Sequence, residues 1–186
     1  MYRTFTPLIT AGLVLALGGS AAAQTPPTPR ADQPNQKAPA SAMNADQDFA
    51  QKAATGGKHE VEGAKFAAGK ATNAGVKSFA NKLVKDHTAA NNELKSLMKK
   101  KNITAAADDK PAAEAWRNET GAAFDRAFID HAIAEHEKDI AAFEAESKDG
   151  SDADLKAWAG KKLPTLREHL KEAQDLKAKL QTTTNR

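Results

Sequence analysis

Four long segments of the chain carry apolar residues at the three- and four-residue spacing of an amphipathic helix. In the second segment, for example, Leu83, Leu94 and Met98 fall on one face. Helices of this kind bury their apolar faces against one another, so the pattern predicts an all-α, antiparallel four-helix bundle. The expected helices cover about residues 45–71, 74–100, 122–147 and 151–180.

Residues at the expected breaks agree with these limits. Thr72 and Asn73 separate the first two helices, and Asn is a favoured N-cap residue. Between the second and third long helices, Pro111 can begin a short helix that ends at Trp116. Pro164 lies inside the fourth helix, where its missing N–H donor and its ring predict a kink.

The residues before the bundle have a different composition. Residues 1–23 combine a positive charge at Arg3, an apolar run over residues 8–17 and a small-residue end, which is typical of a secretory signal peptide. Residues 24–43 contain five prolines among small and polar residues and are expected to form a disordered linker. The predicted organisation is a signal peptide over 1–23, a Pro-rich linker over 24–43, the bundle over 44–181 and a frayed tail over 182–186.

Composition narrows the function classes further. The net charge of +3 reflects a small excess of Lys, not a polybasic surface, so nucleic acid is not an expected partner. The absence of cysteine excludes disulfides, thiolate metal sites and cysteine nucleophiles. The leader's apolar run is too short for a membrane span, and the mature chain is expected to carry no transmembrane segment. We therefore expect an exported, periplasmic protein.

Each predicted helix has one ionisable residue in the middle of its apolar face. These residues are Glu60, His87, His136 and His169. Bundle cores build metal sites from inward-facing Glu and His side chains, and three imidazoles with one carboxylate suit Zn, Fe, Mn or Cu. The pattern therefore predicts a divalent metal ion held by these four residues. A second interpretation stays open, in which each histidine is a hydrogen-bonded core residue and Glu60 forms a buried ion pair.

The heights of the four residues along the bundle bear on this hypothesis. Glu60 and His87 lie at similar distances from the turn between their helices and can share a layer. His136 and His169 differ by about 9 Å at 1.5 Å per residue, which is too far for one tight site in ideal helices. A kink at Pro164 would absorb part of this offset. His59 and His131 fall off the apolar faces, so we expect them to face solvent, although rotation of its helix would bring His131 in.

Beyond these four residues, the sequence contains few candidate functional residues and no common catalytic motif. Asp86, Glu135 and Glu168 are expected to surround the four core residues or to lie at the surface. The chain has no Gly-rich phosphate loop, no His-Glu-x-x-His and no Gly-x-Ser-x-Gly sequence. This favours a binding protein over an enzyme.

The ordered set of motifs resembles the bacterial exported domain-of-unknown-function 4142 family, whose members are often labelled outer-membrane proteins. The matching pieces run from Asp48-Phe49 and Glu60-Val61 through Val76-Lys77, Phe79-Ala80, Asp86-His87, Gly121 to Asp125, His136, Phe143 and Leu163-Pro164 to His169. The resemblance implies a ferritin-like four-helix bundle of the bacterial envelope with no established activity. An apolar residue stands three positions before each core histidine, so the Glu-x-x-His motif of ferritin-like di-iron proteins is absent.

Two functions remain open from the sequence. The first is a periplasmic bundle that binds a metal ion for metal handling or for protection of the envelope under stress. The second is a non-catalytic structural or protein-interaction module of the cell envelope, in which the polar core residues fix the register of the helices. In either case a protein partner in the envelope or a second copy of the chain is an expected contact. We also expect the protein to be soluble or peripherally attached to the outer membrane.

Overall fold

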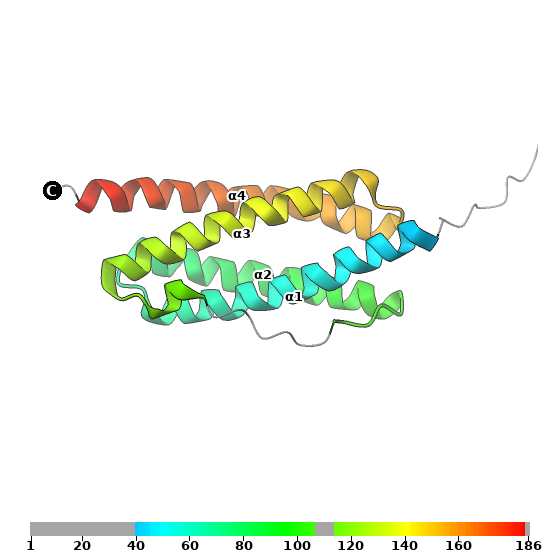
Figure 1. Cartoon of the computed structure of the whole chain (residues 1–186), viewed down its shortest axis with the longest axis horizontal. Coiled ribbons are helices and arrows are strands. Elements are labelled where there is room, and N and C mark those ends of the chain that lie inside the picture. Colours follow the sequence, from blue (N-terminus) through cyan, green and yellow to red (C-terminus); the bar gives the residue numbers. More distant parts are fainter. Residues whose placement is uncertain (1–39, 107–113, 185–186) are drawn as a thin grey trace, which may run out of the picture. The chain divides into compact units, whose positions relative to one another are not determined.

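The computed structural model describes residues 40–106 and 114–184 of the chain. The expected signal peptide and almost all of the expected linker lie outside these residues. The elements are α1 (Ala40–Lys70), α2 (Ala74–Lys100), the 3₁₀ helix η1 (Ala115–Asn118), α3 (Gly121–Asp149) and α4 (Ala153–Thr184) (Figure 1).

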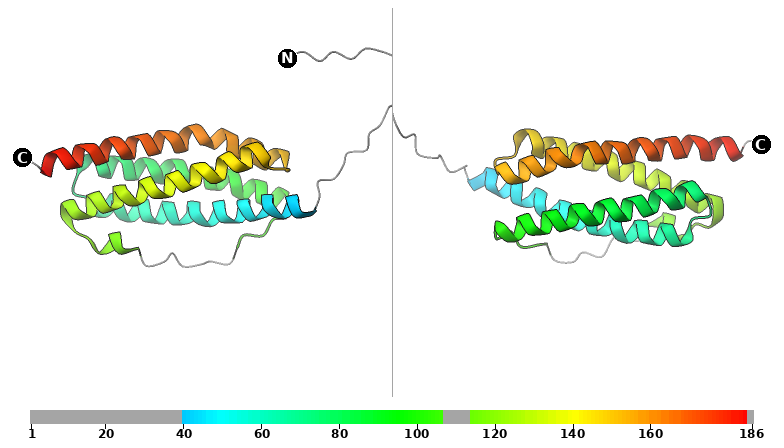
Figure 2. Two further views of the ribbon diagram at one scale, coloured as in Figure 1. Left: turned by 45° about the horizontal axis from the view of Figure 1, so that its top comes forward. Right: turned by 180° about the vertical axis from the view of Figure 1, so that it is seen from behind.

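The four long helices form two antiparallel hairpins that pack face to face. Helix α1 pairs with α2, and α3 pairs with α4, in the two most extensive contacts (Figure 2). Helix α2 ends at one end of the bundle, and α3 begins at the other (Figure 1). One long crossover between two hairpins is the connectivity of ferritin-like bundles. The predicted all-α four-helix fold is confirmed.

Several element boundaries differ from the sequence-based expectation. Helix α1 begins at Ala40, five residues before the expected Ala45, because the intervening residues include good helix formers. The expected short helix before residue 117 is instead a single 3₁₀ turn, η1, and Pro111 lies outside the described residues. Helix α4 continues through Pro164 and on to Thr184, so residues 182–184 of the expected frayed tail are helical.

The apolar core is divided into two clusters, one toward each end of the bundle. The first cluster includes Phe79, Phe124 and Ile129, and the second includes Leu94, Leu155 and Trp158. On every long helix the predicted ionisable residue falls between the residues that contribute to these two clusters. A polar layer therefore crosses the middle of the bundle. None of the helices within residues 40–106 and 114–184 is long and apolar enough to span a membrane.

Candidate metal centre

Three histidines from three different helices meet in the polar layer. His87 on α2, His136 on α3 and His169 on α4 each expose 6% or less of their surface. One ring nitrogen from each lies within 4.8 Å of the other two, a spacing at which a metal ion can be held. His136 Nε2 and His169 Nδ1 are only 3.3 Å apart. The structure thus brings together all three histidines of the predicted site.

The meeting of His136 and His169 corrects the expected 9 Å offset. Helix α3 extends to Asp149, two residues beyond the expected end, which leaves a smaller difference in height between the two residues. Every helical side chain also leans toward the N-terminus of its own helix. In this antiparallel pair, His136 leans away from the α3–α4 turn and His169 leans toward it. The two rings therefore converge, and no break at Pro164 is needed.

The outer partners of His136 and His169 fix which ring nitrogen carries a proton. His136 Nδ1 lies 2.8 Å from the carbonyl oxygen of Ala132, which can only accept a hydrogen bond. His169 Nε2 lies 3.1 Å from Asp86 Oδ2, also an acceptor when ionised. In the neutral rings, His136 Nε2 and His169 Nδ1 then present lone pairs to each other. Such lone pairs repel unless a proton or a cation lies between them.

His87 is held from the opposite side by Glu60. His87 Nδ1 lies 2.9 Å from Glu60 Oε2, and both side chains are largely buried. His87 Nε2 is buried without a hydrogen-bond partner among the described residues. Each histidine is thus anchored through one ring nitrogen by a carbonyl or carboxylate, as is usual for metal-ligating histidines. Glu60 meets the histidines as the anchor of His87, and its other oxygen, Oε1, lies 4.0 Å from His136 Nδ1.

The electrostatics of the layer differ from one histidine to the next. Burial lowers the pKa of His136 to about 4, and burial also lowers the pKa of His169 despite its hydrogen bond to Asp86. Burial would also lower the pKa of His87. The charge and hydrogen bond of Glu60 outweigh this effect and raise the pKa of His87. Burial would raise the pKa of Glu60, yet the charge and hydrogen bond of His87 outweigh it and lower the pKa of Glu60. Glu60 and His87 therefore favour each other's charged forms, whereas burial favours the neutral forms of His136 and His169.

Asp139 is a functional candidate that sequence reasoning missed. It lies three residues after His136, so the two share a face of α3, and it approaches Glu60 and His87 closely enough to interact with their charges. Burial, reinforced by the charge of Glu60, raises the pKa of Asp139 to about 7. The His-x-x-Asp spacing was the available signal. It was overlooked because the apolar face of this helix passes through Ile140 instead.

The other two histidines of the bundle lie outside the cluster. His131 Nε2 is 3.0 Å from Glu114 Oε1, and its ring stacks on Trp116. His59 is half-buried beside a cavity. Both were expected to face solvent, and both instead lie at partly covered positions. Asp86, expected near the core histidines or at the surface, anchors His169.

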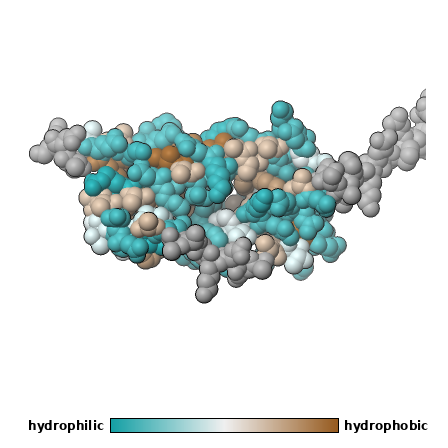
Figure 3. Space-filling view, viewed as in Figure 1, coloured by the Kyte–Doolittle hydropathy of each residue, from teal (hydrophilic) through white to brown (hydrophobic). Residues whose placement is uncertain are grey.

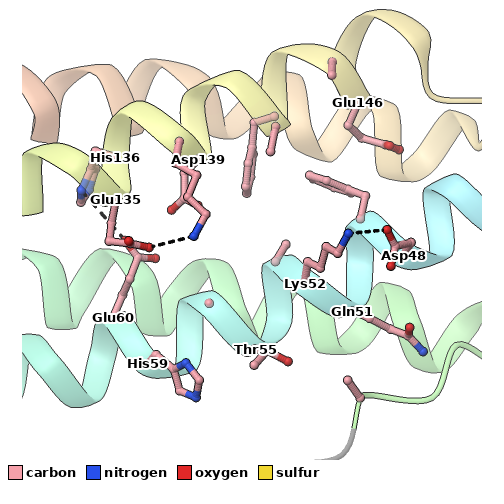
Figure 4. A pocket seen from close by; sticks show the side chains of 18 of the residues that line it. Asp48, Gln51, Lys52, Thr55, His59, Glu60, Glu135, His136, Asp139 and Glu146 are labelled. Carbon is pink, nitrogen blue, oxygen red and sulfur yellow. Dashed lines mark hydrogen bonds and ion pairs between the residues drawn. The ribbon is translucent and has the colours of Figure 1, made fainter. Parts of the chain in front are cut away.

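Two cavities reach the polar layer, and Glu60 and Asp139 line both of them. A cavity of about 1130 Å³ lies between α1 and α3 and touches Glu60, His136 and Asp139 (Figure 4). A cavity of about 370 Å³ on the side of α2 and α4 touches His87 and His169. His136 thus borders the first cavity, and His87 and His169 border the second.

The family model described as a domain of unknown function (DUF4142) matches residues 31–176. The chain belongs to the DUF4142 family. This confirms the resemblance drawn from the sequence motifs. No curated protein matches this DUF4142 chain.

Two solved structures of similar fold come from bacteria. One is a DUF305 protein from Streptomyces coelicolor, with a TM-score of 0.64 at 12% identity, covering 73% of this chain and 93% of that one. Another is a conserved hypothetical protein, rv2844, from Mycobacterium tuberculosis, with a TM-score of 0.61 at 13% identity, covering 72% and 97%. At these identities the likeness establishes the four-helix fold of the DUF4142 domain and nothing about its chemistry.

Proposed function

We propose that this DUF4142 protein binds a divalent transition-metal ion through His87, His136 and His169. The observation that carries the proposal is the convergence of three buried imidazoles whose far nitrogens are each held by an oxygen acceptor. That arrangement leaves one nitrogen of each ring available to a shared cation. Glu60 belongs to the site as the carboxylate that orients His87.

The donor set favours some metals over others. Imidazole nitrogen suits Zn, Cu and Fe, whereas Mn prefers oxygen ligands, and Cu(II) binds most tightly in the divalent series. Metal–nitrogen bonds of about 2.0–2.1 Å place two ligands of a tetrahedral ion about 3.3 Å apart. The 3.3 Å between His136 Nε2 and His169 Nδ1 matches this edge. Zn(II) and Cu(II) are therefore the ions we expect among Zn, Cu, Fe and Mn.

The physiological role that fits this site is metal handling or protection of the envelope under metal stress. Its support is the secretion-type leader over residues 1–23, which would deliver the bundle to the periplasm. A soluble bundle with one buried site suits a carrier or buffer of a single ion. A metal-bound water facing either cavity would add reactivity, but the chain shows no motif that requires it.

A second function is favoured by a specific contact. The 2.9 Å ion pair between His87 and Glu60 already satisfies part of the layer without any metal. Such buried polar pairs can fix helix register in a structural or interaction module of the envelope. In that case the three histidines serve the fold alone.

Metal content separates these two functions. The untagged protein would be purified from the periplasm, its metal measured by mass spectrometry, and the apo-protein titrated with Zn(II), Cu(II), Fe(II) and Mn(II). We expect about one ion per chain, lost in His136→Ala and His169→Ala and retained in His131→Ala, whose histidine pairs with Glu114 outside the cluster. Absence of metal in the purified protein, together with no binding on titration, would sink the metal proposal and support the structural module.

A further inference from the structure

The cavity between α1 and α3 is large because α1 presents small residues there. Ala53, Gly56 and Gly63 line its α1 wall, and a Cβ placed on Gly56 would meet nothing within 4 Å. The space-filling view shows this face of the molecule hollowed between the two helices (Figure 3). Its volume of about 1130 Å³ is that of a small-molecule site.

The α3 wall of the cavity carries a row of carboxylates. Glu135, Asp139, Glu146 and Asp149 all line it, at intervals of four, seven and three residues that keep them on one face of the helix. In Figure 4, Asp139 points from α3 toward α1, and Glu60 points back from α1. Two lysines also border the cavity, but Lys52 is paired with Asp48, and Lys138 with Glu135. The negative charge of the row therefore exceeds the positive charge beside it.

Glu146 is the carboxylate in this row that most needs a partner. The residue exposes 6% of its surface, and its Oε1 is buried with no hydrogen-bond partner among the described residues. Burial, together with the charges of Asp46 and Asp152, raises the pKa of Glu146 to about 7. Asp139, two helical turns away, also has no hydrogen bond or ion pair within the described part of the chain. A buried polar group such as Glu146 is normally satisfied, so a cationic group is the complement that it lacks. Asp139 is half-buried and adds a second carboxylate on the same wall.

We propose that the cavity between α1 and α3 binds a linear aliphatic polyamine, with ammonium groups beside Asp139 and Glu146. Seven residues of α-helix separate these carboxylates by about 10 Å, so they cannot converge on one metal ion. Between them the wall includes the apolar residues Ala142 and Phe143, which suit a methylene chain. Charge at intervals along an apolar wall is the complement of an extended polyamine.

Calorimetric titration of the metal-free protein with spermine at low salt tests this proposal. We expect saturable binding of about one spermine per chain that weakens as salt is added. Each of Asp139→Asn and Glu146→Gln should weaken binding about tenfold, and the double variant should weaken it further. Glu137→Gln, on the exposed face of the same helix, is the matched control and should bind like the wild type.

Several outcomes would overturn the polyamine site. Butylamine, which has one ammonium group, should bind far more weakly than spermine. Equal affinity would show that the spacing of the Asp139 and Glu146 carboxylates does not contribute to binding. An equal loss of spermine affinity in Glu137→Gln and in the cavity variants would show that spermine responds only to the overall charge of the protein. His169→Ala, which abolishes the proposed metal site, should leave spermine binding intact, so the two proposals succeed or fail separately. Unchanged circular dichroism of each variant verifies that the fold is retained.

Discussion

Asp46 and Asp125 hold the two ends of the bundle in equivalent ways. Asp125, near the start of α3, accepts hydrogen bonds from the backbone N–H groups of Thr72 and Asn73 in the α1–α2 turn. Asp46, near the start of α1, accepts hydrogen bonds from the backbone N–H groups of Ser151 and Asp152 in the α3–α4 turn. Each hairpin therefore contributes a buried carboxylate that closes the turn of the other hairpin, an approximate two-fold relationship.

Replacing Asp125 by Ala should destabilise the bundle strongly. Asp125 is 1% exposed, and its removal would leave the backbone N–H donors of Thr72 and Asn73 and the Thr72 hydroxyl without their acceptor. We expect a loss of about 3 kcal/mol in the free energy of unfolding, measured by urea denaturation. Asp130 lies on the same helix as Asp125 and forms an exposed ion pair with Lys177 of α4, so Asp130→Ala should cost less than about 1 kcal/mol. Similar losses in both variants would contradict the turn-closing role.

Asp86 should tune the metal site without taking part in it directly. It anchors His169 Nε2 at 3.1 Å, and its removal leaves that nitrogen, on a ring whose side chain is 1% exposed, without its acceptor. Asp86→Ala should weaken metal affinity about 10- to 100-fold, as measured by competition with a chromogenic chelator. Glu168→Ala, which removes the exposed carboxylate next to His169 in sequence, is the control and should leave the affinity unchanged. If Asp86→Ala binds metal like the wild type, the hydrogen bond to His169 does not support the site.

The fold and the histidines were predictable because both depend on short-range periodicity. A 3.6-residue repeat is set within each helix, so the four helices and the inward positions of His87, His136 and His169 follow from local sequence. The height at which two rings meet depends on helix ends and on the lean of side chains in antiparallel helices. Those are properties of the assembled pair, and for this reason the sequence overestimated the separation of His136 from His169.

The carboxylates were harder to assign than the histidines. Glu60 was predicted as a ligand, and the structure places it against His87 Nδ1, a contact that depends on rotamers as well as on helical spacing. Asp139 was missed because the cavity beside it arises from small residues on α1, a different helix. Charge crowding across a cavity is a long-range property, which a pattern along one helix does not reveal.

Metal binding should release a proton from His87. The charge of Glu60 raises the pKa of His87, whereas a metal ligand must be deprotonated at the nitrogen that binds. Calorimetric titration of the apo-protein with Zn(II) at pH 6, in two buffers of different ionisation enthalpy, counts the protons released. We expect about one proton per ion in the wild type and markedly fewer in Glu60→Gln, in which the charge that raises the pKa of His87 is gone. Equal release from both proteins would show that His87 does not enter the site as a cation.

Glu146 should make the bundle less stable as the pH rises. Its pKa is raised to about 7 in the folded chain by burial and by Asp46 and Asp152, so the folded state binds more protons than the unfolded state between the two pKa values. Stability from this group is present at low pH and is lost as the pH rises toward 7. Glu146→Gln removes the charge and should raise Tm by a few degrees at pH 8, with little change at pH 5. A pH-independent shift of Tm would show that the carboxyl group is not titrating in the folded bundle.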